Sequence, residues 1–105
     1  MPAFIKNNKL DVQKIRKQFP ALQQAVHGKP LAYLDNAATT QKPQAVLDTL
    51  MHHYQYDNAN VHRGIHALAS RATAALEAAR TATQKFIHAA EASEIIFTAG
   101  ATASI

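Results

Sequence analysis

The sequence Glu94-Ile95-Ile96-Phe97-Thr98-Ala99-Gly100-Ala101-Thr102 carries the clearest information on the fold of this 105-residue chain. Its first half is a continuous apolar run, which is typical of a strand covered on both faces of a sheet. Its second half is a small-residue turn that leads into a helix start, where unpaired N–H groups can bind an anion. Such a turn is more often only a connection, so its assignment depends on the rest of the chain. We expect an α/β fold with a candidate phosphate site at Gly100, Ala101 and Thr102.

Three helices are predicted upstream of this strand. The strongest periodic pattern covers residues 67–88, and such a helix would be about 33 Å long at 1.5 Å per residue. Pro43 favours the start of a second helix, whose apolar face continues to about Tyr56. Residues 11–18 predict a short amphipathic helix with Asp11 in its first turn and Phe19-Pro20 at its end.

Turns and loops of small polar residues separate these helices. The sequence His27-Gly28-Lys29-Pro30 has turn chemistry, and the apolar run 31–34 after it predicts a second short strand. This strand leads into a loop that allows a ligand to approach the backbone, Asp35-Asn36-Ala37-Ala38-Thr39-Thr40. We expect the Asp35 carboxylate to cap the turn. Two strands do not make a stable parallel sheet, so we expect an α/β fold of which most of the sheet is missing.

Composition and charge exclude several classes of function. The formal net charge is +4, but Asp11 interrupts the basic N-terminal residues and no aromatic residues alternate with them, so we expect a solvated helix face and no nucleic-acid partner. No apolar run approaches the roughly 20 residues of a membrane span, and no signal peptide is seen, so a cytoplasmic protein is expected. The chain contains no cysteine. The pairs His52-His53 and His62 with His66 lack a third ligand, so no metal site is predicted.

Three blocks, in this order along the chain, carry a family resemblance. They are Tyr33-Leu34-Asp35-Asn36-Ala37-Ala38-Thr39-Thr40-Gln41-Lys42-Pro43, Asn58-Ala59-Asn60-Val61-His62-Arg63-Gly64-Ile65-His66 and Glu94 to Thr102. Together they resemble the N-terminal signature blocks of group II (SUF-type) cysteine desulfurases. These enzymes belong to the class V aminotransferases, which are fold-type I pyridoxal-phosphate enzymes, and are similar to selenocysteine lyases.

The resemblance implies an activity, a cofactor and partners. The expected reaction converts L-cysteine to L-alanine and leaves an enzyme-bound persulfide, which a homodimeric enzyme passes to a sulfur-acceptor protein for iron–sulfur cluster assembly. Gly100, Ala101 and Thr102 would hold the phosphate of pyridoxal 5'-phosphate. The substrate side would be formed by Asn36-Ala37-Ala38, and the active-site mouth or dimer contact by His62-Arg63. Residues 1–30 would form an N-terminal helix and turn, and residues 31–105 the start of the class V domain.

The sequence departs from the family pattern in ways that affect its activity. Ala101 and Ala103 replace the first threonine and the glutamate of the usual glycine-threonine-threonine-glutamate turn. None of Lys29, Lys42 and Lys85 matches the lysine that forms the Schiff base, and there is no cysteine to accept sulfur. We therefore expect the chain to be an N-terminal fragment that is inactive and marginally stable alone. The alternatives are selenocysteine cleavage, kynurenine cleavage or epimerisation by another class V relative, and a non-enzymatic helical module that binds a partner through its alanine-rich helix.

Overall fold

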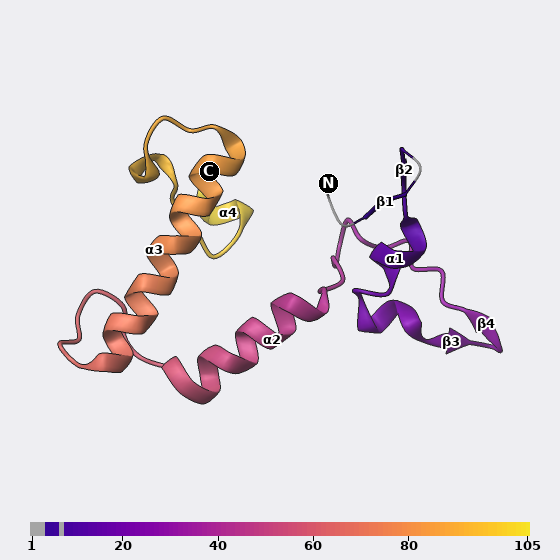
Figure 1. Ribbon diagram of the computed structural model, residues 1–105, viewed down its shortest axis with the longest axis horizontal. Coiled ribbons are helices and arrows are strands. Elements are labelled where there is room, and N and C mark those ends of the chain that lie inside the picture. Colours follow the sequence, from indigo (N-terminus) through magenta and orange to yellow (C-terminus); the bar gives the residue numbers. More distant parts are fainter. Residues whose placement is uncertain (1–3, 7) are drawn as a thin grey trace. The chain divides into compact units, whose positions relative to one another are not determined.

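The computed structural model describes residues 4–6 and 8–105, and the chain divides into two compact units, Met1–His52 and His53–Ile105 (Figure 1). The described part is rich in helix, and its strands are four two-residue segments in two antiparallel hairpins. Among these residues no helix is both long and apolar enough to cross a membrane.

The first unit begins with a small hairpin and a short helix. Strand β1 (Ile5–Lys6) pairs with β2 (Lys9–Leu10), and helix α1 (Val12–Arg16) follows. The Asp11 carboxylate caps this helix by accepting a hydrogen bond of 2.9 Å from the Lys14 N–H, which satisfies an otherwise unpaired donor of the first turn. The predicted N-terminal helix is therefore confirmed, although it is shorter than expected and is followed by the 3-10 helix η1 (Pro20–Gln23).

The predicted turn at His27-Gly28 joins a second hairpin. Strands β3 (Ala25–Val26) and β4 (Lys29–Pro30) pair on either side of it. His27 and Gly28 have φ angles of 52° and 74°, and positive φ at both central residues is the backbone that a type I′ hairpin requires. The turn prediction is confirmed, and the turn is the tip of a hairpin.

Residues 31–43 contain no regular element, so the predicted strand at residues 31–34 is wrong. Leu34 is 94% exposed, and no described strand pairs with this segment. The predicted helix after Pro43 is confirmed as α2 (Gln44–His52), which is followed by the π-helical turn η2 (His53–Asp57). Within the first unit, the Gln44 N–H donates to the Gln18 carbonyl at 2.7 Å, which ties the start of α2 to the residues after α1.

The second unit is organised by α3 (Ala67–Ile87). This helix matches the prediction to within one residue, because both of its ends are defined by local contacts. The His66 imidazole accepts a hydrogen bond from the Ala69 N–H at its start, and His88 takes a left-handed conformation with φ 58° at its end, the usual geometry of a helix C-terminus. Its two buried residues are Ala69 and Ala72.

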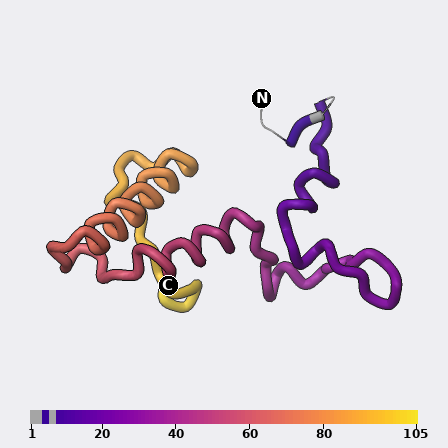
Figure 2. The backbone as a smooth tube through the Cα atoms, turned by 60° about the horizontal axis from the view of Figure 1, so that its bottom comes forward, coloured from indigo at the N-terminus to yellow at the C-terminus, as the bar shows by residue number. Residues whose placement is uncertain are grey.

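After α3 the chain turns back toward the middle of the helix (Figure 2). It forms the 3-10 helix η3 (Ala92–Glu94), an irregular extended segment and the short helix α4 (Ala101–Ser104). The predicted strand at residues 94–98 is wrong, because no described strand pairs with it. Ile95 is 7% exposed, whereas Ile96 is 79% exposed. Within the described chain Ile95 is therefore covered, whereas Ile96 is open and Phe97 is half-exposed at 49%.

Candidate functional site

The turn Gly100-Ala101-Thr102 lies where the extended segment meets α4. Three contacts gather on the Gly100 carbonyl: the Ala103 N–H at 3.1 Å, and the hydroxyls of Thr98 at 3.2 Å and Ser104 at 3.1 Å. The two hydroxyls are themselves 2.6 Å apart. These hydrogen bonds fix the carbonyl side of the turn without using the N–H groups of Ala101 and Thr102.

The opposite side of this turn is open. A Cβ atom placed on Gly100 would meet no atom within 4 Å among the described residues. No described side chain caps α4, so the first N–H groups of this helix keep their capacity to donate to an anion. Thr102 is exposed, and its hydroxyl is a further possible donor. Open space and several donors around one glycine fit the requirements of a phosphate group, with one hydroxyl fewer than a threonine at position 101 would supply.

The loop that contains Asn36-Ala37-Ala38 is held in shape by hydrogen bonds among residues 33–39. The Thr39 N–H donates to the Asp35 carbonyl at 3.0 Å, and the Tyr33 hydroxyl lies 2.8 Å from the Thr39 carbonyl oxygen. The predicted cap by the Asp35 carboxylate is therefore replaced by its carbonyl. All three residues of the Asn36-Ala37-Ala38 segment are exposed, so their small side chains and backbone are accessible in the first unit.

The loop that contains His62 and Arg63 packs tightly against α3. The His62 N–H donates to the Thr73 hydroxyl at 3.0 Å, and the His62 Nε2 atom lies 3.2 Å from Glu77 Oε1. A Cβ atom at Gly64 would overlap that of the fully buried Ala69, so this close approach requires glycine. His62 is thereby oriented by its contacts with the helix, while Arg63 is exposed.

One face of α3 connects this loop to the segment that leads into the Gly100 turn. The face carries Thr73, Glu77 and Arg80, which are spaced by four and three residues and so lie on the same side of the helix. Glu77 contacts His62 through Oε1 and the Arg80 Nε atom through Oε2, each at 3.2 Å. Arg80 in turn donates through Nη1 to the Ile95 carbonyl.

The structure thus brings the His62 loop and the segment that leads to the Gly100 turn against one helix, α3. The Asn36-Ala37-Ala38 segment belongs to the first unit. Glu77 and Arg80 were not among the residues predicted from the sequence. The sequence does contain a signal for both, because they are charged residues three positions apart in an otherwise alanine-rich helix. This spacing places them on the same side of the helix.

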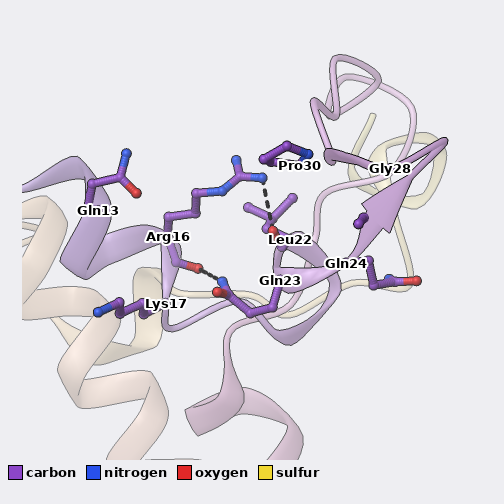
Figure 3. Close-up of a pocket in the computed structure, with 9 residues that line it drawn as sticks. Gln13, Arg16, Lys17, Leu22, Gln23, Gln24, Gly28 and Pro30 are labelled. Atoms are coloured by element: carbon purple, nitrogen blue, oxygen red, sulfur yellow. Dashed lines mark hydrogen bonds between the residues drawn. The ribbon is translucent and has the colours of Figure 1, made fainter.

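A separate pocket of about 380 Å³ lies in the first unit between α1, η1 and the β3–β4 hairpin (Figure 3). Its Arg16 guanidinium donates to the carbonyls of Leu22 and Leu31, and the Gln23 side-chain amide donates to the Arg16 carbonyl at 2.7 Å. These contacts hold the hairpin on the helix. The pocket includes none of the residues predicted for the cofactor or substrate.

Comparison with known proteins finds a family model and several named relatives to which the chain is similar. Residues 32–105 match the family model of aminotransferase class-V. The chain is 57% identical over 91 residues to a protein of Synechocystis named probable cysteine desulfurase. It is 55% identical over 95 residues to probable cysteine desulfurase 1 of Mycobacterium leprae, and 50% identical over 95 residues to a cysteine desulfurase of Synechococcus elongatus. The matches cover 87–90% of this chain but 15–22% of the relatives' own length.

Proposed function

The chain belongs to the aminotransferase class-V family, and on this premise we propose that it builds the phosphate-holding side of the active site in a pyridoxal-phosphate-dependent cysteine desulfurase of fold type I. The names of its relatives support the reaction, since proteins with 50–57% identity to it are named cysteine desulfurase or probable cysteine desulfurase. The observation that carries the proposal is the open turn at Gly100, with its uncapped helix start.

In this proposal each part of the chain has a defined task. The N–H groups of Ala101 and Thr102 and the Thr102 hydroxyl bind the cofactor phosphate, and Gly100 leaves space for it. His62 and Arg63 lie at the mouth of the site or the contact between protomers of a homodimer. Asn36-Ala37-Ala38 faces the substrate, where small side chains leave room for L-cysteine.

The bound cofactor would supply an electron sink for cleavage of the carbon–sulfur bond. The products are L-alanine and a persulfide, whose sulfur goes to an acceptor protein. The 105 residues contain no cysteine, so the thiol that accepts the sulfur has to be supplied by residues other than these. The chain by itself would therefore hold and orient the cofactor, and it would not complete the reaction.

A chimera tests this function. The present chain replaces the matching segment of the Synechocystis relative, to which it is 57% identical, and the unmodified relative serves as the positive control. Formation of L-alanine from L-cysteine is measured with pyridoxal phosphate present, in parallel with L-selenocysteine as substrate. We expect L-alanine from L-cysteine at a rate comparable to that of the control. A folded chimera that forms L-alanine only from L-selenocysteine, or from neither, would contradict the proposal.

A further inference from the structure

We propose that Arg80 is a positioning residue, which fixes the path of the segment entering the Gly100 turn and thereby sets how well that turn holds a phosphate group. The inference rests on the proposed function, because it gives Arg80 its role through the phosphate-holding turn. Arg80 lies on α3, 15 residues before the segment in sequence, and does not itself belong to the turn.

Arg80 contacts the segment at two points. Its Nη1 atom donates to the Ile95 carbonyl, and its guanidinium carbon lies 5.3 Å from the centroid of the Phe97 ring. Hydrogen bonds from a charged donor are stronger than neutral ones, and a cation over an aromatic ring adds attraction. Two contacts on alternate residues of an extended segment define both its position along α3 and its rotation.

Contacts with α3 hold the segment within the described residues. Residues 95–99 pair with no described strand, so these contacts are the ones that the described chain itself supplies. The Ile95 side chain is buried, which anchors one residue. The Ile95 carbonyl and the Phe97 ring are held by Arg80, and Gly100 follows three residues later.

Glu77 holds the Arg80 guanidinium in the required orientation. The carboxylate Oε2 atom lies 3.2 Å from Arg80 Nε, so the planar group uses Nε for Glu77 and Nη1 for Ile95. A lysine ammonium has no such fixed fork and cannot reproduce this division of donors. The Arg80 side chain is 24% exposed and that of Glu77 44%, so both groups are accessible to water. Arg80 also contacts the segment.

The test uses the chimera and measures its affinity for pyridoxal phosphate and for pyridoxal, which lacks the phosphate. The ratio of the two dissociation constants reports phosphate recognition, whereas a general loss of stability affects both ligands alike. The variants are Arg80→Met, which removes the donors, and Arg80→Lys, which keeps the charge. The matched control is Arg71→Met, because Arg71 is also on α3 but pairs with Asp57 at 2.5 Å.

We expect both Arg80 variants to lower the preference for pyridoxal phosphate about tenfold, since misplacement of the turn weakens charged hydrogen bonds to the phosphate. Arg71→Met should leave the ratio unchanged. If the unmodified chimera shows no preference for pyridoxal phosphate, the proposed function fails. If it does and the Arg80 variants match it, or if they lose both ligands together with their helical circular dichroism, the inference about Arg80 is overturned.

Discussion

Replacement of Gly64 by alanine should separate the His62 loop from α3. The added Cβ would lie closer than 3.0 Å to the Cβ of Ala69 and 3.1 Å from Nε2 of His66. Carbon atoms pack at about 3.5–4.0 Å, so the overlap has to be relieved by movement. Ala69 is fully buried in α3 and cannot retreat, which leaves the loop as the part that moves.

The size of the effect follows from this overlap. Overpacking of a well-packed site costs about 1–3 kcal/mol, and displacement of the loop also strains the contacts of His62 with Thr73 and Glu77. The buried apolar residues of the described chain are only Ala69, Ala72 and Ile95. A loss of about 1–3 kcal/mol is a large fraction of the stability that so small a core supplies.

The assay is urea unfolding of the 105-residue chain combined with amide NMR spectra. We expect the free energy of unfolding to fall by about 1–3 kcal/mol and the amide signal of His62 to shift. The matched control is Gly28→Ala, where no described atom lies within 4 Å of an added Cβ. It should strain the left-handed turn by about 1–2 kcal/mol and leave the His62 signal in place. An unchanged His62 signal in Gly64→Ala, with stability within about 0.5 kcal/mol of the wild type, would show that the close approach of Gly64 to Ala69 does not position the loop.

Three further predictions concern the turn, the isolated chain and the extended segment. Thr102→Ala in the chimera should weaken pyridoxal phosphate binding about tenfold by loss of one hydrogen bond to a charged group; unchanged affinity in a spectroscopic titration would place the phosphate elsewhere. The 105-residue chain with pyridoxal phosphate and L-cysteine should release no sulfide above the background of the free cofactor, and release well above it would contradict the expectation that the chain alone is inactive. In hydrogen exchange of the same chain, the amides of Ile96 and Phe97 should exchange faster than those in the middle of α3, because no described strand pairs with them. Strong protection at both residues would show that the segment is held by a partner.

The parts of the fold that could be predicted from sequence are those defined by local contacts. The periodic apolar pattern locates α3, and His66 and His88 define its two ends through contacts within one turn. His27-Gly28 likewise specifies its own backbone conformation. A strand is different, because it exists only when another segment pairs with it. The apolar runs at residues 31–34 and 94–98 have strand composition but no pairing partner in the described chain.

The roles of the candidate site residues remain predictions. The blocks around His62 and Gly100 were found through the family resemblance, and the structure places the His62 loop and the segment before Gly100 against one helix. The role of Arg80 could not be predicted, because its contact with the Ile95 carbonyl depends on how the chain turns back after α3. The predicted division into residues 1–30 and 31–105 remains a prediction. The boundary between the two compact units of the structure is different and falls between His52 and His53 in the sequence.

The proposed function requires the Gly100 turn to hold the phosphate of the cofactor, and amide hydrogen exchange of the chimera measures this binding at the turn itself. The exchange of the peptide spanning residues 98–105 is followed by mass spectrometry with pyridoxal phosphate, with pyridoxal and with neither. Because the N–H groups of Ala101 and Thr102 would be the donors, pyridoxal phosphate should slow their exchange and pyridoxal should not. Slower exchange elsewhere in the chimera, with peptide 98–105 unchanged by pyridoxal phosphate, would contradict the claim.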